Sequence, residues 1–380
     1  MLTPTPLSRR QWLISSGATL AGLALSSRFL NFEARAQMTP ERLAATAPVK
    51  ARLSLNENPF GPSPAALEAM MHNLSGGKAC RYPYAEVGEL IELLAKKEGV
   101  APENIVLSVG SGEILETVGG MFGRMQGEAI YASPGYLQLP GAVTANGGKA
   151  IPVPVNARQE HDLEAMASKV VGASSVVYVA NPNNPTGTVG DTATLAEFVK
   201  EVSKKAFVLL DEAYLDIADH YASRTLVGLV KEERNLLVAR TFSKIHGLAG
   251  MRIGYGVTSR KFAAQLRSSA LGTLTSPSIA GAVASLKDTD FVAASRTKIV
   301  AEREKLLALL RELGRPYAES QTNFVFFRTG RPHAEVQAAM MEESVSIARA
   351  FPPMTDWARI SIGLPEENEL ARAALRKVLG

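Results

Sequence analysis

The sequence predicts an α/β fold with a mostly parallel sheet flanked by helices, followed by a smaller α+β domain. Short runs of β-branched and aliphatic residues alternate with amphipathic helical segments over most of the chain, which is typical of parallel βαβ units. Beyond about residue 290, a long helical pattern and more widely spaced strands replace this alternation. The chain has 380 residues, of which 46% are hydrophobic and 21% charged. This composition suits a globular protein of two or three domains.

The first 36 residues have the features of an export signal. The pair Arg9-Arg10 begins a basic segment, residues 14–25 are mildly apolar, and Ala34-Arg35-Ala36 forms a small-residue cleavage pattern. These three parts define a signal peptide, and the paired arginines resemble the twin-arginine type. We therefore expect export to the periplasm by the twin-arginine route, and a cytoplasmic protein if the signal is not functional. An amphipathic first helix of the folded domain is the alternative.

After an N-terminal arm over residues 37–65, a large domain is expected over residues 66–284. Strands are predicted where aliphatic runs are bounded by turn residues, and helices where apolar residues recur every three or four positions. The predicted strands span residues 106–109, 129–132, 176–180, 207–210, 236–239 and 253–257. The predicted helices span residues 86–97, 114–122 and 193–204.

A small C-terminal domain is expected over residues 285–380. The same rules predict a long helix at its start, followed by shorter helices and strands that alternate. The predicted helices span residues 292–313, 333–343 and 367–379, and the predicted strands span residues 323–328, 344–349 and 358–362.

Charge and cysteine content argue against several classes of function. Residues 1–36 carry a net charge of +3, so the formal charge of +4 leaves about +1 for the rest of the chain. Such a body offers little attraction for nucleic acid. Cys80 is the only cysteine and the five histidines are scattered, so we predict no metal site. No later segment has 18 uninterrupted apolar residues, so we expect no membrane span in the mature form.

Polar residues follow several predicted strands, at the edge of a parallel sheet where ligands bind. Gly110-Ser111-Gly112 opens a helix whose free N–H groups attract anions, although an ordinary helix start has the same pattern. A rigid turn holds Asn184, and the next strand is followed by Asp211 and Tyr214. Taken singly, a turn and a helix cap explain these residues equally well.

A lysine in an apolar loop completes this set of groups. Lys244 lies between Phe242 and Leu248, with Arg252 eight residues later. A desolvated lysine is an amine nucleophile that can form Schiff bases. Pyridoxal phosphate requires such a lysine, a helix terminus and an arginine for its phosphate, a carboxylate for its ring nitrogen, and hydrogen-bond donors for its 3'-oxygen. The sequence therefore predicts a site for pyridoxal 5'-phosphate.

Eight motifs follow one another over roughly 300 residues. They are Leu55-Asn56-Glu57-Asn58-Pro59, Arg81-Tyr82-Pro83, Gly110-Ser111-Gly112-Glu113, Pro134-Gly135-Tyr136, Asn183-Asn184-Pro185-Thr186-Gly187, Asp211-Glu212-Ala213-Tyr214, Ser243-Lys244 with Arg252, and Arg359-Ile360-Ser361-Ile362-Gly363. In this order the sequence resembles the class I/II aminotransferase family of fold-type I pyridoxal-phosphate enzymes, and within it the histidinol-phosphate aminotransferase branch. The resemblance implies a large domain with a mostly parallel seven-stranded sheet and a smaller α+β C-terminal domain.

The resemblance assigns roles around the cofactor ring. Lys244 would be the Schiff-base lysine and, once displaced by the substrate, the general base at Cα. Asp211 would pair with the pyridinium nitrogen, and Tyr136 would stack on the ring. Asn184 and Tyr214 would hydrogen-bond the 3'-oxygen. Lys244, Asp211 and Tyr214 are the catalytic residues that the resemblance implies.

The resemblance also implies a phosphate cradle and a homodimer. Ser111 and Gly112 would supply N–H groups to the cofactor phosphate, and Ser243 and Arg252 would complete the cradle. Gly112 stands where many histidinol-phosphate enzymes have Asp, and the small residue keeps the backbone function. Tyr82 resembles the tyrosine that reaches the phosphate of the neighbouring subunit, so we expect a homodimer with shared active sites.

The substrate end of the site resembles the family less completely. Arg359 resembles the arginine that binds the substrate α-carboxylate by a two-pronged contact, with Asn184 beside it. The histidinol-phosphate branch uses an upstream arginine for the substrate phosphate, and Arg349 is the candidate at a short spacing of ten residues. Because histidine synthesis is cytoplasmic, the export signal favours a different amino donor. We expect transfer from an L-amino acid, aromatic for example, or from histidinol phosphate, to a 2-oxo acid.

Other activities remain open at this point. The same groups support a pyridoxal-phosphate-dependent decarboxylase of the threonine-phosphate type, or an amino-acid oxidase. A non-enzymatic ligand-binding protein on this scaffold is the least expected. Phe60, Phe351 and Trp357 could form an apolar wall for an aromatic substrate, or could simply pack in the core.

Overall fold

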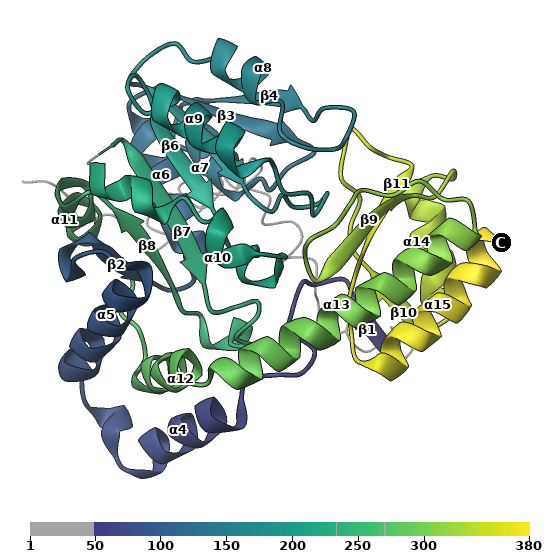
Figure 1. The fold of residues 1–380 in the computed structure, drawn as a ribbon, viewed down its shortest axis with the longest axis horizontal. Coiled ribbons are helices and arrows are strands. Elements are labelled where there is room, and N and C mark those ends of the chain that lie inside the picture. The colour runs from purple at the N-terminus through teal and green to yellow at the C-terminus, as the bar shows by residue number, and fades with distance from the viewer. Residues whose placement is uncertain (1–48, 233, 270) are drawn as a thin grey trace, which may run out of the picture. The chain divides into compact units, whose positions relative to one another are not determined.

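The computed structural model describes residues 49–232, 234–269 and 271–380, and a seven-stranded sheet organises the larger part of them (Figure 1). The strand order is β2-β8-β7-β6-β5-β3-β4. Neighbours from β7 to β4 are parallel, whereas β8 is antiparallel to both β7 and β2. The strands are β2 (Ile105–Ser108), β3 (Glu128–Ser133), β4 (Lys149–Pro154), β5 (Ser175–Ala180), β6 (Phe207–Asp211), β7 (Leu236–Thr241) and β8 (Gly254–Thr258).

Helices cover both faces of this sheet, because successive side chains of each strand point to opposite sides. In β5, Val177 and Val179 belong to one apolar cluster, while Val176 and Tyr178 belong to another on the opposite face. Five helices contribute to the first cluster: α4 (Pro64–Ser75), α5 (Tyr84–Glu98), α8 (Leu163–Ser168), α9 (Thr192–Val202) and α12 (Ser276–Lys287). Three contribute to the second: α6 (Ser111–Arg124), α7 (Gln138–Ala145) and α11 (Arg260–Ser268).

The C-terminal part is built on two small sheets and three helices. β9 (Phe324–Arg328) pairs antiparallel with β11 (Trp357–Ser361), and β10 (Val345–Ile347) pairs parallel with β1 (Ala51–Leu53) near the start of the described chain. The long helix α13 (Thr289–Glu312) runs from α12 to these strands (Figure 1). Two further helices, α14 (His333–Glu342) and α15 (Pro365–Leu379), complete an apolar core shared with β1.

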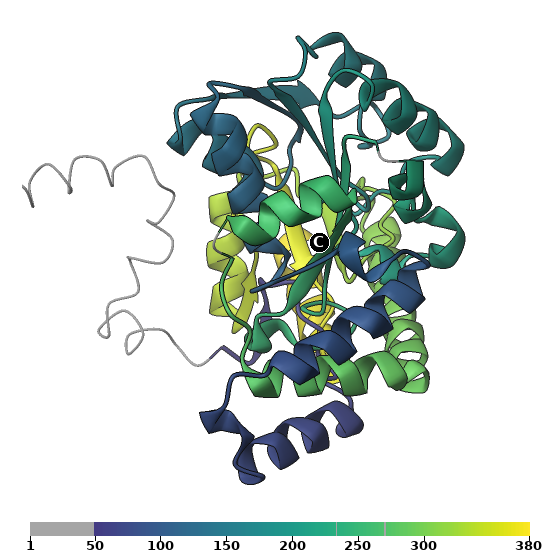
Figure 2. The same ribbon diagram turned by 90° about the vertical axis from the view of Figure 1, so that its left-hand side faces the viewer.

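Helix α4 (Pro64–Ser75) lies at one end of the molecule, at the bottom of Figure 2, and packs against α12. Ser63 caps its first turn by accepting a hydrogen bond from the backbone of Ala66. Its outer side is apolar and exposed, since Leu67, Met71 and Leu74 each keep half or more of their surface. A short 3₁₀ turn (Lys78–Cys80) joins α4 to α5.

The predicted α/β fold with a mostly parallel seven-stranded sheet is confirmed. Every strand and helix predicted along residues 86–379 has a counterpart in the structure, with ends that differ by at most three residues. The sequence did not predict β1, β4, α4, α7, α8, α11, α12 or the single turn of α10 (Tyr221–Arg224). The predicted signal at residues 1–36 lies outside the described residues, and the predicted division of the chain into four segments stays a prediction.

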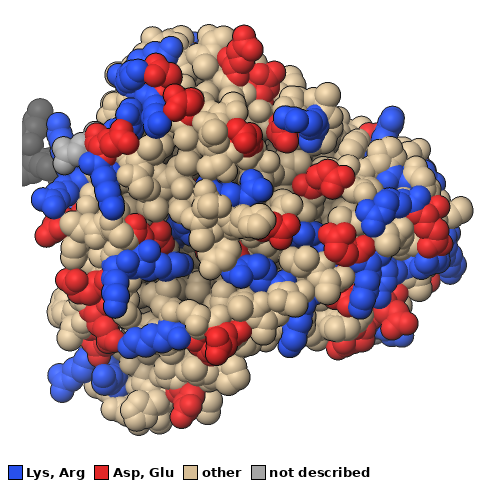
Figure 3. Space-filling view, in the orientation of Figure 1, with Lys and Arg blue, Asp and Glu red and all other residues tan. Residues whose placement is uncertain are grey.

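The surface charge and the helices of the molecule can be compared with those typical of nucleic-acid-binding and membrane proteins. On the face seen in Figure 3, basic and acidic side chains are interspersed and no broad area carries a single sign. Within the described part of the chain, none of the helices has the length and apolar character needed to cross a membrane.

Candidate active site

A cavity of about 520 Å³ opens at the carboxyl ends of the central strands. The last residues of β5, β6 and β7, which are Ala180, Asp211 and Thr241, all line it. Eleven of the twelve predicted site residues also line it: Ser111, Gly112, Tyr136, Asn184, Asp211, Tyr214, Ser243, Lys244, Arg252, Arg349 and Arg359. The twelfth, Tyr82, lies outside the cavity and keeps 75% of its surface exposed.

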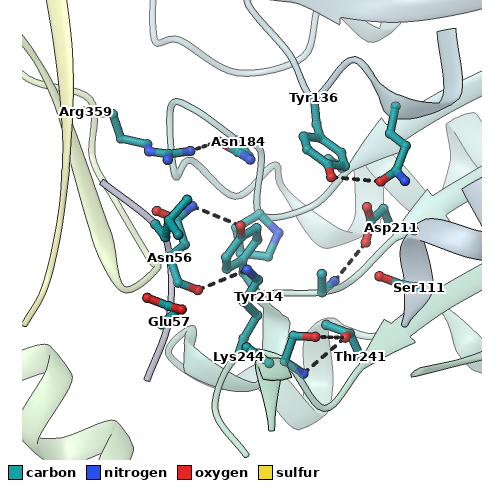
Figure 4. Close-up of a pocket in the computed structure, with 18 of the residues that line it drawn as sticks. Asn56, Glu57, Ser111, Tyr136, Asn184, Asp211, Tyr214, Thr241, Lys244 and Arg359 are labelled. Atoms are coloured by element: carbon teal, nitrogen blue, oxygen red, sulfur yellow. Dashed lines mark hydrogen bonds between the residues drawn. The ribbon is translucent and has the colours of Figure 1, made fainter. Parts of the chain in front are cut away.

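The amine of Lys244 faces the N-terminal segment (Figure 4). Its Nζ donates a 2.9 Å hydrogen bond to the main-chain oxygen of Asn56 and lies 5.1 Å from the ring centroid of Tyr214. Asn56 in turn donates through Nδ2 to the Tyr214 hydroxyl at 2.9 Å. Phe242 and Leu248, which flank the lysine in sequence, are buried in the core. These two buried side chains therefore anchor the loop in the core, while its lysine lines the cavity.

Asp211 is a buried carboxyl group with two neutral donors. Tyr178 donates to Oδ2 at 2.8 Å, and the Ala213 backbone donates to Oδ1 at 3.1 Å. Burial raises the pKa of Asp211 above its usual value, while the Tyr178 hydroxyl, the Ala213 N–H and the charge of Lys244 oppose the rise. A carboxylate in this position is stabilised further by a cation placed within hydrogen-bond distance.

An anion cradle forms where α6 begins. Among the described residues no side chain caps this helix, so its first N–H groups, at Ser111 and Gly112, are available to a ligand. Arg252 lies beside them and donates to Ser243 Oγ at 3.4 Å. The guanidinium packs so tightly on Gly110 that a Cβ there would lie 2.3 Å from Nη2. Only glycine leaves room for this arrangement.

Tyr136 forms another wall of the cavity (Figure 4). Its hydroxyl donates to Gln138 Oε1 at 2.8 Å. Burial, reinforced by the neighbouring Tyr214 and Asp211, raises the pKa of Tyr136 to about 12. The phenol therefore stays neutral at physiological pH and presents an uncharged ring to the cavity.

Arg359 occupies the opposite end of the cavity. It donates to Asn184 Oδ1 at 2.6 Å and to the Ser54 main-chain oxygen at 3.0 Å, and its buried Nε has no partner among the residues that the structure describes. Burial lowers the pKa of Arg359 to about 10, so the group is still cationic at neutral pH. Arg349 is exposed at the rim, and both guanidinium groups lie within 5 Å of the Phe351 ring centroid. Neither forms an ion pair with any residue that the structure describes.

These groups fit pyridoxal phosphate. The cradle of free N–H groups and Arg252 suits a phosphate, and buried Asp211 has no cation hydrogen-bonded to it among the described residues, which suits a protonated ring nitrogen. Lys244, Tyr214 and Asn184 surround the space between them. The unpartnered Nε of Arg359 suits a substrate carboxylate or phosphate.

Three further residues shape this site with little sequence signal for that role. Asn56 belongs to a motif, Tyr178 occupies a core position of a strand, and Gln138 belongs to no motif. The only sequence signal for Tyr178 is a hydroxyl within an otherwise aliphatic strand. Of the three aromatic residues considered for an apolar wall, only Phe351 lines the cavity. Trp357 packs in the same apolar cluster as Phe351 without lining the cavity, and Phe60 packs in another cluster.

Comparisons with known proteins agree with this geometry. The family model described as aminotransferase class I and II matches residues 48–375. A histidinol-phosphate aminotransferase of Limosilactobacillus fermentum is 35% identical over 85% of this chain and 89% of its own length. An aromatic amino acid aminotransferase of Streptomyces avermitilis is 33% identical over 86% of this chain and 90% of its own. The crystal structure of histidinol-phosphate aminotransferase from Sinorhizobium meliloti in complex with pyridoxal-5'-phosphate has a TM-score of 0.77 at 28% identity, covering 89% of this chain and 93% of that one.

Proposed function

The chain belongs to the class I and II aminotransferase family and is a pyridoxal-phosphate-dependent transaminase, and from this premise we propose that it takes the amino group of an aromatic L-amino acid or of histidinol phosphate and passes it to a 2-oxo acid. The observation that carries the proposal is the convergence of Lys244, Asp211 and Arg359 on one cavity. These three groups supply the amine, the buried anion and the anion receptor that transamination requires.

Each residue has a defined task in this proposal. Bound in the cavity, pyridoxal phosphate supplies an electron sink for the charge left at Cα when its proton is removed. Lys244 is the point of attachment, and its Nζ, once free, takes the Cα proton as general base, a contribution of typically 10²–10⁴-fold. Asp211 holds the ring nitrogen in its protonated form. Tyr214 and Asn184 direct hydrogen bonds to the 3'-oxygen.

The substrate end supports both candidate donors. Arg359 presents a planar group with an unpartnered Nε, which suits the carboxylate of an amino acid. Arg349 at the rim adds a second positive charge, which suits the dianionic phosphate of histidinol phosphate. The Phe351 ring between them offers an apolar surface to an aromatic side chain. Relatives with both names support this pair of candidates.

A donor screen tests the proposal. Purified protein loaded with pyridoxal phosphate is mixed with phenylalanine, tyrosine, tryptophan or histidinol phosphate, and conversion to pyridoxamine phosphate is followed by absorbance. We expect conversion with at least one donor, with a keto product and neither carbon dioxide release nor oxygen uptake. Lys244→Ala should abolish conversion without changing the circular dichroism spectrum. Normal conversion by that variant would exclude the role of Lys244, and carbon dioxide release would favour the decarboxylase alternative.

We propose that the protein is a homodimer. Leu67, Met71 and Leu74 on α4 and the stacked rings of Tyr82 and Tyr84 form an exposed apolar surface, which we call the α4 surface. Apolar patches on this scale mark interaction sites. Tyr82 would then reach the partner subunit's active site, in keeping with its position outside the cavity of its own chain.

We also propose export by the twin-arginine route, on the strength of the Arg9-Arg10 pair and the cleavage pattern at residues 34–36. Replacing both arginines with lysine should leave the protein in the cytoplasm of an expressing bacterium, as measured by cell fractionation. Undiminished export of that variant would contradict this assignment.

A further inference from the structure

Asn56 connects the two ends of the active site. It lies between β1 and α4, is 5% exposed, and uses both ends of its side-chain amide. Nδ2 donates to the Tyr214 hydroxyl at 2.9 Å (Figure 4). At the other end of the amide, Oδ1 accepts from Ser361 Oγ at 2.8 Å. Ser361 is two residues beyond Arg359 on β11. A single side chain therefore links the strand of the substrate arginine to the phenol beside Lys244.

The direction of the Asn56–Tyr214 hydrogen bond has a chemical consequence. A phenol has one proton to donate, and its oxygen can also accept. Because Asn56 donates to the oxygen of Tyr214, the phenol proton is not used in this contact. Had the amide been turned over, its carbonyl oxygen would take that proton. In the observed orientation the Ser361 hydroxyl donates to Oδ1, so both ends of the amide have a hydrogen-bond partner.

We propose that Asn56 is a positioning residue that holds the Tyr214 hydroxyl with its proton directed at the 3'-oxygen of pyridoxal phosphate. The proposal rests on the proposed function, which places Tyr214 beside that oxygen. Asn56 touches no reacting atom through its side chain and acts through Tyr214. Ser361 is the second hydrogen-bond partner of the amide, so the chain of contacts runs from β11 through Asn56 to Tyr214.

The side-chain role is separable from the main-chain role of the same residue. The carbonyl oxygen of Asn56 accepts from Lys244 Nζ, and a substitution at position 56 retains that oxygen. Asn56→Ala removes the donor to Tyr214. Asn56→Asp keeps the shape but replaces the N–H donor with a carboxylate oxygen, which would accept the phenol proton and turn it away from the cofactor. The two variants therefore differ in how strongly they disturb the Tyr214 proton: Asn56→Ala leaves it free, whereas Asn56→Asp draws it away from the cofactor.

The experiment measures the affinity of the apoprotein for pyridoxal phosphate, by quenching of protein fluorescence, and the absorption spectrum of the bound cofactor. Losing one hydrogen bond corresponds to about 3- to 10-fold weaker binding for Asn56→Ala. We expect a larger loss and a displaced absorption maximum for Asn56→Asp. In a Tyr214→Phe background, both substitutions should change the affinity by less than about twofold. Asn58→Ala is the matched control, because Asn58 is buried on the same segment but donates to the Ile245 main-chain oxygen.

Each outcome decides the proposal. An unchanged affinity and spectrum in both Asn56 variants overturns it, and so does an equal effect of Asn58→Ala or an effect that persists in the Tyr214→Phe background. If Tyr214→Phe alone changes neither readout, the role of Tyr214 in the proposed function fails instead. If the Asn56 variants do not fold, Ser361→Ala is measured, since it removes the donor to Asn56 Oδ1 and so loosens the side chain that holds Tyr214. We then expect weaker binding that again depends on Tyr214, and an unchanged affinity overturns the proposal.

Discussion

At the scale of single residues, Asp211 is held by a buried tyrosine rather than by a cation. Tyr178 and Asp211 lie on the same face of neighbouring strands β5 and β6, and the phenol donates to Oδ2 at 2.8 Å. Burial raises the pKa of this carboxyl, and the Tyr178 hydroxyl works against the rise. Before the cofactor binds, the Tyr178 hydroxyl is therefore one of the groups that favour the ionised form of Asp211.

Tyr178→Phe should make the apoprotein less stable at neutral pH. A carboxyl whose pKa is raised on folding destabilises the folded state above that pKa, and the penalty disappears as the pH falls below the unfolded value near 3.8. Removing a hydrogen bond to an ionised group costs about 1.5–3 kcal/mol. We therefore expect a lower free energy of unfolding at pH 7, by urea titration, and a smaller difference towards pH 4.

Tyr131→Phe is the control for this prediction. Tyr131 is the register partner of Tyr178 on β3, and within the described residues its phenol donates to no acid. The Tyr131→Phe variant should show a much smaller loss of stability than Tyr178→Phe, with little dependence on pH. An equal loss in both variants would mean that the Tyr178 hydroxyl does not act through Asp211.

The sequence could supply the residues that follow strands, but not those that reach the site from a distance. Lys244, Asp211 and Asn184 stand in turns next to recognisable strands, so their convergence follows from parallel pairing. Asn56 meets Tyr214 across 158 positions of sequence. Tyr178 looks like an ordinary core residue, because its position in a buried strand says nothing of the acid on the neighbouring strand.

At the scale of elements, the start of α6 depends on a backbone that only glycine readily adopts. Gly110 has φ 77° and ψ 156°, and Arg252 occupies the space where a side chain would begin. The close approach brings the guanidinium to the free N–H groups of the helix. The phosphate cradle is therefore a property of the strand–helix junction as a whole.

Gly110→Ala should weaken the binding of pyridoxal phosphate by more than tenfold, as measured by equilibrium dialysis with the apoprotein, because Arg252 must move away. Gly99→Ala provides the comparison: Gly99 also has a positive φ, of 64°, but a Cβ there meets only Lys231 Nζ at 3.8 Å. That variant should lose about 1 kcal/mol of stability and keep its affinity. If both variants bind pyridoxal phosphate with similar affinity, the position of Arg252 does not contribute to cofactor binding.

The elements that the sequence did not predict have physical reasons. β4 contains Pro152 and Pro154, which argue against a strand, but it lies at the sheet edge and pairs only with β3, where proline is tolerated. β1 has only three residues and owes its form to β10. The local sequence shows neither the edge position of β4 nor the pairing of β1 with β10. The amphipathic helices and aliphatic strands, in contrast, carry their own periodicity.

At the scale of the whole molecule, the α4 surface is the feature that a single chain leaves unexplained. Met71 is 62% exposed and Tyr84 is 80% exposed. Burial of apolar area stabilises association by roughly 25 cal/mol per Å² before the entropic cost of binding. Covering the α4 surface with a second copy of the chain would therefore stabilise the association, in line with the proposed homodimer.

The expected mass in solution is twice that of one chain, measured by light scattering. Leu67→Glu combined with Met71→Glu places two charges on the α4 surface and should shift the protein towards single chains, with weaker cofactor binding because Tyr82 loses its target. Val171→Glu adds a charge at an apolar residue that is 70% exposed elsewhere, and should leave the mass unchanged. A wild-type protein with the mass of one chain would contradict the homodimer proposal.

The pairing of β1 with β10 sets a limit on when the enzyme can be completed. Residue 51 leaves the ribosome about 290 residues before its partner at 345 exists, and the segment just after β1 carries Ser54 and Asn56, which contact Arg359 and Lys244. The nascent chain can form its central sheet and the flanking helices early. The site for pyridoxal phosphate can be completed only after β10 and β11 have been synthesised. A truncation ahead of residue 345 would therefore remove β10 and Arg359, and with them the catalytic centre, as well as helix α15.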